Sequence, residues 1–102
     1  MESYPYTGVV GHCDRSRTKS EVLVESYSWI KNQTESVIID NLNKGPVIAS
    51  IDASQPIFIN YSGGILNSYS CKRHDNNHWV VIVGYGTDHF IIRNSWGKGW
   101  GL

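Results

Sequence analysis

The feature that most constrains the fold is a pair of apolar runs near the C-terminal end of the chain. HWVVIVGYG covers residues 78–86, and HFIIRN covers residues 89–94. Both runs are rich in β-branched and aromatic residues, which is typical of strands, and only Thr87 and Asp88 separate them. A connection this short makes the two strands antiparallel neighbours. The sequence therefore predicts a hairpin in which the start of the first strand lies beside the end of the second.

Two further strands are predicted upstream of this hairpin. EVLVESYSWI, residues 21–30, alternates partly and is rich in β-branched and aromatic residues, and residues 47–52 form a second short run of the same kind. Strands outnumber helices in this assignment. We therefore predict an α+β domain, in which one helix packs on an antiparallel sheet.

The helix is predicted between these two strands. Asn32 and Glu35 have the spacing of a capping box, and Gly45-Pro46 ends the apolar stripe that follows. A short helical turn is expected at residues 55–60, and Gly63-Gly64 predicts a tight turn.

Composition excludes several classes of protein. The 102 residues suffice for one small domain, and 40% hydrophobic with 18% charged residues is a globular composition rather than a disordered one. Nine basic and nine acidic side chains cancel, and the short charged run at residues 14–19 is interpreted as a solvated loop. We therefore expect neither a nucleic-acid partner nor attachment to an anionic membrane. No apolar run approaches the ~20 residues of a membrane span.

Three observations bear on whether the sequence is a complete translation product. Residues 1–8 have neither the basic leader nor the apolar core of a signal peptide. Asn32 and Asn60 each begin a triplet of the N-glycosylation pattern. The chain also stops at Leu102, inside a motif rich in tryptophan and glycine. The last two observations favour an incomplete product over a cytosolic protein.

His78 stands at the start of the first hairpin strand, where a lone histidine is usually structural. Its expected neighbour changes that interpretation, because the hairpin places Asn94 beside it. An asparagine oxygen that accepts one imidazole N–H fixes the tautomer and leaves the other nitrogen for proton transfer. Trp96 would cover this hydrogen bond from water and strengthen it. The pattern indicates an oriented general base.

Several motifs together resemble those of the papain-like cysteine proteases. They are HWVVIVGYG followed by IIRNSWGKGWG, Tyr4-Pro5-Tyr6-Thr7-Gly8, Gly45-Pro46-Val47 before a strand, and Tyr61-Ser62-Gly63-Gly64-Ile65. The resemblance covers nearly all of residues 1–102. It implies the C-terminal half of the peptidase domain, which is the barrel-like antiparallel right-hand domain of the papain fold, truncated before its final strands.

The resemblance also implies roles for four residues. His78 resembles the histidine that takes the proton of a cysteine thiol and later protonates the leaving amine, and Asn94 resembles the asparagine that orients it. Trp96 resembles the tryptophan that shields this pair, and Trp100 a second tryptophan near the leaving-group side. No metal or other cofactor is implied.

A substrate pocket is implied at Ser50, Asn77 and Trp79. The position after the histidine is usually small in the family, so the indole of Trp79 would shrink or fill the main specificity pocket. Packing of this ring into the barrel is an equal alternative. Leu102 stands where the family usually has glutamate, and the strands expected after it are missing, so the sheet should expose an unpaired edge and an apolar face.

The thiol nucleophile is missing from the chain. The family motif C-G-[SA]-C-[WY] lies ~130–150 residues before the histidine and asparagine, whereas only 77 residues precede His78. Neither Cys13 nor Cys71 precedes an aromatic residue or opens a helix, which is the setting that lowers a thiol pKa. The resemblance implies instead that both pair with cysteines outside the chain. A zinc site is the alternative, with ligands from Cys71, His74 and His78 and a fourth from the His12-Cys13 pair.

We therefore predict part of an enzyme that cleaves peptide bonds. It supplies the histidine and asparagine but is inactive without the N-terminal half that carries the nucleophile. The alternative is a degenerate homologue that keeps the fold, or binds peptides, without cleavage. The family's usual setting implies a lysosomal, vacuolar or extracellular location, with peptides or proteins as substrates.

Overall fold

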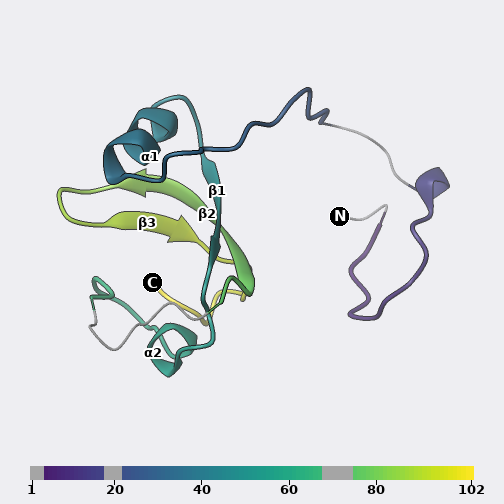
Figure 1. Cartoon of the computed structure of the whole chain (residues 1–102). Coiled ribbons are helices and arrows are strands. Elements are labelled where there is room, and N and C mark those ends of the chain that lie inside the picture. Colours follow the sequence, from purple (N-terminus) through teal and green to yellow (C-terminus); the bar gives the residue numbers. More distant parts are fainter. Residues whose placement is uncertain (1–3, 18–21, 68–74) are drawn as a thin grey trace.

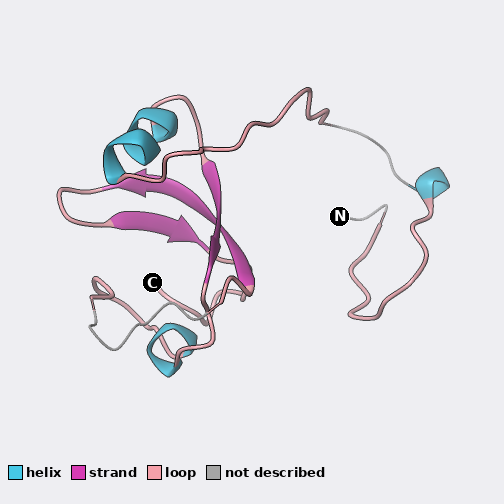
Figure 2. Cartoon of the chain, in the orientation of Figure 1, coloured by secondary structure: helices cyan, strands magenta, loops and turns pink. Residues whose placement is uncertain are grey.

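A computed structural model describes residues 4–17, 22–67 and 75–102 of the chain. In chain order the elements are a single 3₁₀ turn, two helices and three strands: η1 (Arg15–Arg17), α1 (Glu35–Leu42), β1 (Val47–Ile51), α2 (Pro56–Ile59), β2 (His78–Tyr85) and β3 (Phe90–Arg93). The strands form one antiparallel sheet in the order β1-β2-β3 (Figures 1 and 2). α1 packs beside β1 and β2, whereas α2 lies at the opposite end of the sheet. The architecture is α+β, as predicted.

The hairpin forms where the sequence predicts it. β2 and β3 pair in antiparallel register, with Ile82 opposite Ile92. The turn between them is closed by the amide of Gly86, which donates to the carbonyl of His89 at 2.8 Å. The short connection brings the ends of the two strands together, and a register shift between Ile82 and Gly84 changes which residues farther along lie side by side.

The buried core is small and lies on one face of β2. Val80 and Ile82 are 3% and 8% exposed, and Ala53 and Phe58 are the other buried apolar residues in the described part of the chain. Because side chains alternate along a strand, His78 shares the face of Val80 and Ile82. The imidazole is therefore directed toward the core rather than toward the outer face of the sheet.

Helix α1 begins later than predicted and without the predicted cap. Its N-cap residue is Thr34, which is extended at φ −73° and ψ 153° and makes no side-chain cap bond. Glu35 is consequently the first helical residue and not the third, so the capping box predicted for Asn32 and Glu35 is wrong. Half-buried apolar residues hold the helix to the sheet instead: Val37, Ile38, Ile39 and Leu42.

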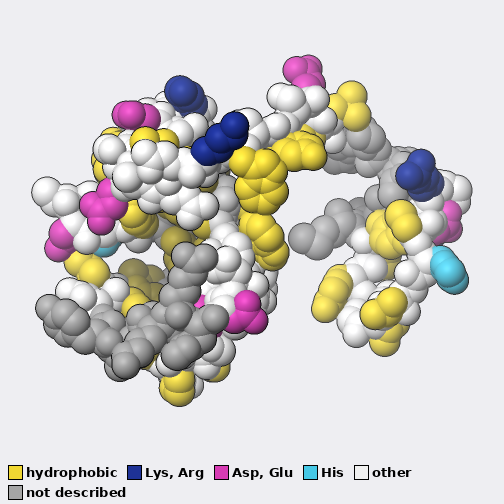
Figure 3. Space-filling view, viewed as in Figure 1, with side chains coloured by type: hydrophobic (Ala, Val, Ile, Leu, Met, Phe, Trp, Pro, Cys, Tyr) yellow, Lys and Arg dark blue, Asp and Glu magenta, His cyan; other side chains and the backbone are white. Residues whose placement is uncertain are grey.

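The strand predicted at residues 21–30 is also wrong. Residue 21 lies outside the described part of the chain, and residues 22–30 form no strand. Leu23 and Trp29 are 79% and 74% exposed, and the segment leads away from the sheet (Figure 1) with apolar side chains on its surface (Figure 3). A preference for strand reflects fit to a pleated, half-buried surface. No such surface adjoins this segment, so its composition does not produce a strand.

The shorter predicted elements are present with small differences in their ends. β1 ends one residue before the predicted Asp52, and α2 occupies the middle of the helical turn expected at 55–60. Gln55 is the N-cap of α2 and Pro56 opens it, which suits proline because its missing N–H would have no helical partner. No helix in the described part of the chain is long and apolar enough to cross a bilayer.

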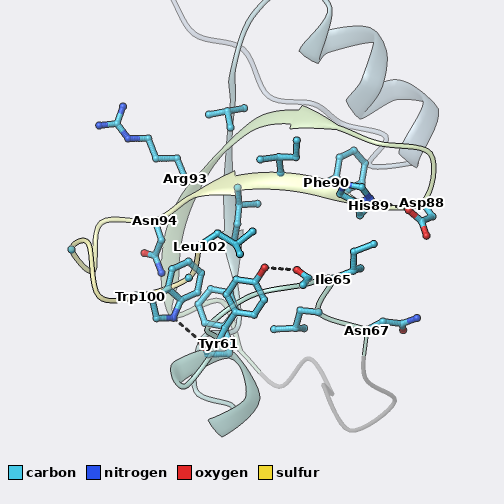
Figure 4. A pocket seen from close by; sticks show the side chains of 18 residues that line it. Tyr61, Ile65, Asn67, Asp88, His89, Phe90, Arg93, Asn94, Trp100 and Leu102 are labelled. Carbon is cyan, nitrogen blue, oxygen red and sulfur yellow. Dashed lines mark hydrogen bonds and ion pairs between the residues drawn. The ribbon is translucent and has the colours of Figure 1, made fainter.

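The three described strands form an open sheet, so the barrel-like closure implied by the resemblance is not seen among them. β1 and β3 each pair with β2 alone, which leaves a free edge on each. A largely apolar pocket of about 1160 Å³ lies beside β3, with Phe90, Ile92 and Leu102 among its lining residues (Figure 4). Among the described residues, β1 and β3 therefore each have an unpaired edge, and apolar side chains line the pocket beside β3.

Candidate active site

The pairing of β2 with β3 brings His78 and Asn94 together. His78 is the first residue of β2, and Asn94 directly follows Arg93, the last residue of β3. Arg93 lies opposite Val81, so the next residue along β3 reaches the other face of the sheet, which is the face of His78. The Nε2 atom of His78 is 2.8 Å from the Oδ1 atom of Asn94.

The orientation of the Asn94 amide assigns the imidazole tautomer. The backbone amide of Ser95 donates to Asn94 Oδ1 at 2.7 Å. Exchanging the oxygen and nitrogen of the side chain would set two N–H donors against each other, so the oxygen faces both Ser95 and His78. Because a carboxamide oxygen only accepts hydrogen bonds, Nε2 of the neutral ring carries the proton.

The Nδ1 atom of His78 is then the proton acceptor. No described residue forms a hydrogen bond to Nδ1, and its lone pair is available to a group that approaches this edge of the ring. An imidazole held in this way can take a proton from a thiol, a hydroxyl or a water molecule. The geometry thus has the form of a general base with a fixed tautomer.

An aromatic ring covers the contact between His78 and Asn94. The centroid of the Trp96 ring lies 4.9 Å from that of His78, with the two planes inclined by 35°. Phe58 of α2 meets Trp96 edge to face, at 5.4 Å between centroids and 78° between planes. The indole is held against the imidazole by this packing, and it limits the access of water to the hydrogen bond.

A glycine turn places the second tryptophan against the first. Gly97 has φ of 85°, in the left-handed region that favours glycine. The chain therefore returns, and Trp100 lies 5.7 Å from Trp96 between ring centroids. The indole Nε1 of Trp100 donates to the carbonyl of Phe58 at 2.8 Å, a bond drawn in Figure 4. The segment that follows β3 is thus tied to α2.

One polar atom of the site has no partner in the described part of the chain. The Nδ2 atom of Asn94 is buried and forms no hydrogen bond there. A buried donor without an acceptor costs about 1–3 kcal/mol. The hydrogen bonding of the site is therefore incomplete within the described residues.

The structure brings together two of the three expected pocket residues. Ser50 is the cross-strand partner of Trp79, so their side chains share the face of the sheet opposite to that of His78. The side chain of Trp79 is 57% exposed, and it does not pack into the core of the described residues. Asn77 is turned away from this pair, because its Oδ1 accepts from the amide of Ala53 at 2.9 Å.

One polar contact at the start of β2 is not predicted by local sequence patterns. The Nδ2 atom of Asn77 donates to Asp52 Oδ1 at 3.1 Å, across 25 residues of sequence. Both residues have side chains common in turns, and no local pattern connects them. Only the register of β1 against β2, in which Ile51 lies opposite His78, predicts that they meet.

Two of the four proposed zinc ligands lie outside the described residues. Cys71 and His74 fall in residues 68–74, so the zinc alternative and the disulfide expected for Cys71 have no structural account. Cys13 is exposed and forms no disulfide in the described part of the chain. Residues 4–17, 22–67 and 75–102 contain no cluster of three or more groups that could hold a metal ion.

Both predicted glycosylation sites are exposed. Asn32 precedes α1 in an irregular segment. Asn60 follows α2, and its Nδ2 atom, the atom that a glycan would modify, donates to the carbonyl of Pro56 at 3.0 Å. A glycan would replace one of the two Nδ2 hydrogens, and the other can keep this hydrogen bond.

Comparison with known proteins assigns the family. The family described as "Papain family cysteine protease" matches residues 1–102, so the chain belongs to the papain family of cysteine proteases. Macrodontain-1 from Ananas macrodontes is 36% identical over 101 residues, and cathepsin K from Mus musculus is 37% identical over 105 residues. The crystal structure of the Carica candamarcensis cysteine protease CMS1MS2 superposes with a TM-score of 0.86 at 34% identity. Bromelain from Ananas comosus gives 0.81 at 29%. The fold is therefore that of the papain family.

The matches extend over almost all of this chain but over less than half of each relative. They include 98% of the chain in all four comparisons. They include 46% of macrodontain-1, 32% of cathepsin K, 46% of the Carica structure and 47% of the bromelain structure. The chain therefore corresponds to a partial domain of these proteases.

Proposed function

We propose that residues 1–102 are the C-terminal half of a papain-like peptidase domain and supply the general base for peptide-bond hydrolysis. The observation that carries this proposal is the 2.8 Å contact between His78 Nε2 and Asn94 Oδ1, which leaves Nδ1 as the proton acceptor. The family's nucleophile motif does not occur in the sequence. The chain alone is accordingly inactive, and its partner is the N-terminal half that carries the thiol.

The proposed reaction uses each nitrogen of His78 for a different task. Nδ1 takes the proton of the partner's cysteine thiol, and the thiolate then attacks the carbonyl carbon of the peptide. The same proton passes from Nδ1 to the leaving amine as the C–N bond breaks, and water later releases the acyl group. Asn94 accepts the Nε2–H bond throughout, which keeps the ring in place and stabilises its positive charge.

The two tryptophans have supporting roles in this proposal. Trp96 covers the hydrogen bond between His78 and Asn94, and its centroid distance of 4.9 Å from the imidazole supports this role. Trp100 lies next to it and lines the leaving-group side. The proposed location, in keeping with the family resemblance and the two glycosylation triplets, is lysosomal, vacuolar or extracellular.

A chimeric protease tests the proposed function. Residues 4–102 replace the matching segment of macrodontain-1, and hydrolysis of a peptide substrate is measured for the chimera and for the isolated chain. We expect turnover from the chimera and none from the isolated chain. A folded chimera with a titratable thiol but without turnover would support the alternative of a non-catalytic homologue. Turnover by the isolated chain that Cys71→Ser abolishes and His74→Ala leaves intact would contradict the proposed division of the active site.

We propose further that Trp79 narrows the main specificity pocket, with Ser50 beside it. The exposed ring of Trp79 faces Ser50 across β1 and β2, and this arrangement supports its role. In the chimera, Trp79→Ala should raise kcat/KM for substrates with a large apolar side chain relative to those with a small one. The expected change in this ratio is about 10–100-fold, the range for one or a few methylene groups in a pocket.

The matched control for Trp79→Ala is Val83→Ala, which removes another exposed apolar side chain of β2, 47% exposed. The ratio of kcat/KM values should not change in this variant. An equal change in both variants, or none in Trp79→Ala, would show that the indole does not border the pocket.

A further inference from the structure

We infer that Asp52 is a positioning residue for His78, acting through the side chain of Asn77. Asp52 directly follows Ile51, the last residue of β1, and opens the loop that leads to α2. Ile51 is the cross-strand partner of His78. The loop after β1 and the segment before β2 therefore run side by side, and polar side chains on one can fix the backbone of the other.

Asn77 joins these two segments through three hydrogen bonds. Its backbone amide donates to the carbonyl of Ile51 at 3.1 Å. Its Oδ1 atom accepts from the amide of Ala53 at 2.9 Å, and its Nδ2 atom donates to Asp52 Oδ1 at 3.1 Å. The residue immediately before His78 is thus bonded to three successive residues at the end of β1.

Asp52 and the backbone amide of Ala53 together fix the orientation of the Asn77 amide. A carboxylate only accepts hydrogen bonds, so the nitrogen of Asn77 must face it and the oxygen must face the amide of Ala53. A hydrogen bond to an ionised acceptor is also stronger than one between neutral groups. Without Asp52, the side chain of Asn77 keeps only its bond to Ala53 and loses the stronger, charge-assisted one.

Asp52 is itself held in a fixed position. Its Oδ1 atom accepts from the backbone amide of Ser54 at 3.0 Å and from the hydroxyl of the same residue at 2.5 Å. Its Oδ2 atom lies 3.4 Å from the amide nitrogen of Asp75, which donates a long hydrogen bond to it. One carboxylate therefore links the loop after β1 to both Asp75 and Asn77.

The consequence is that His78 is restrained from two directions. Asn94 holds the far end of the ring at Nε2, and the Asp52–Asn77 contact holds the backbone from which the ring projects. Proton transfer requires the acceptor atom within a few tenths of an ångström of its productive position. This inference rests on the proposed function, because the position of Nδ1 matters for catalysis only where His78 is the base.

The test measures the imidazole directly and does not require turnover. The full 102-residue chain is labelled isotopically at histidine nitrogens, and NMR spectra report the tautomer of His78 and the exchange of its Nε2 proton with water. In the unmodified chain we expect the Nε2–H tautomer with slow exchange. In Asp52→Ala we expect mixed tautomers and exchange faster by about tenfold, the factor for one hydrogen bond of ordinary net strength.

Two further variants separate positioning from loss of stability. Asp52→Asn keeps an oxygen that accepts from Asn77. The exchange rate of the His78 Nε2 proton in this variant should therefore lie between those of the unmodified chain and of Asp52→Ala. Asp88→Ala removes an acid at the opposite end of the hairpin, where it contacts His89 at 2.9 Å, and should leave His78 unchanged. The backbone amides of Val80 and Ile82 should keep their protection in all variants, because they lie inside β2.

Four outcomes would overturn the inference. They are an unmodified chain without the protected Nε2–H signal, an unchanged ring in Asp52→Ala, equal effects in Asp52→Ala and Asp88→Ala, and loss of protection at Val80 and Ile82 in parallel with His78. An active chimera together with an unchanged ring would remove the role of Asp52 and leave the proposed function standing. An inactive chimera together with a disordered ring in Asp52→Ala would remove the proposed function and leave the positioning role of Asp52 standing.

Discussion

His78→Ala should lower kcat/KM of the active chimera by roughly 10²–10⁴-fold, the contribution of a positioned acid and base. The variant removes the acceptor for the thiol proton and the donor for the leaving amine in a single change. Neither Asn94 nor Trp96 can substitute for it, because a carboxamide and an indole do not exchange protons near neutral pH. The measurement is steady-state hydrolysis of a peptide substrate, with active sites titrated by a thiol-specific reagent.

The control for His78→Ala is His89→Ala at the other end of the hairpin. His89 is also an imidazole of this sheet region, and its ring contacts Asp88 at 2.9 Å, far along β2 from the proposed site. Its removal should leave kcat/KM within a factor of about two, as expected for a surface substitution outside the site. Similar losses in the two variants would contradict the assignment of the base to His78.

The contact with Asn94 makes a second expectation about the same variant. In this proposal Asn94 acts only through His78. A variant in which both residues are replaced should therefore be no less active than His78→Ala, because the effects of residues that work as a unit are not additive. Independent, multiplying losses would place Asn94 in a role that does not depend on the imidazole.

The sheet and the central contact of the site follow from local sequence patterns. HWVVIVGYG and HFIIRN predict two strands, and the connection of two residues leaves them one way to pair. Antiparallel pairing brings the start of β2 to the end of β3, and a register shift between Ile82 and Gly84 then places Asn94 on the face of His78. The hairpin therefore predicts the approach of His78 to Asn94, whereas the irregularity that gives them a common face is seen only in the structure.

Other features depend on contacts that local sequence does not contain. Residues 22–30 have the composition of a strand, but β-branched residues adopt a strand only where a neighbouring strand and a covering layer exist. The helix starts at Glu35 because residues 31–34 remain outside the helical ladder, although the spacing of Asn32 and Glu35 satisfies a capping box. In both cases the surroundings of the segment override its own preference.

The contact between Asp52 and Asn77 illustrates the same limit at the site. Each residue alone has a composition typical of a turn, and the pair is separated by 25 positions. Its prediction requires the register of β1 against β2, which depends on which face of each strand is buried. Local patterns therefore identify the groups that could do chemistry, whereas the groups that position them appear only with the tertiary structure.

Phe58→Ala should lower the free energy of unfolding of the chimera by about 3–5 kcal/mol, the usual cost of removing a buried phenylalanine ring. Phe58 is 7% exposed, and its ring lies 5.4 Å from that of Trp96 and 5.0 Å from that of Trp100 between centroids. The loss removes a shared contact for both indoles and leaves a cavity between α2 and the segment after β3. Urea unfolding followed by tryptophan fluorescence measures the change.

The neighbouring residue of α2 provides the control. Ile59→Ala removes an apolar side chain that is 48% exposed, so its cost should be about 1 kcal/mol or less. Phe58→Leu retains most of the apolar volume and should cost less than Phe58→Ala. Equal losses from Phe58→Ala and Ile59→Ala would show that the aromatic cluster does not stabilise this end of the sheet.

Because Trp96 packs between Phe58 and the imidazole, the same cluster joins the stability of the fold to the protection of the His78–Asn94 hydrogen bond. We therefore expect the variant with the greater loss of stability to show the faster exchange of the Nε2 proton as well.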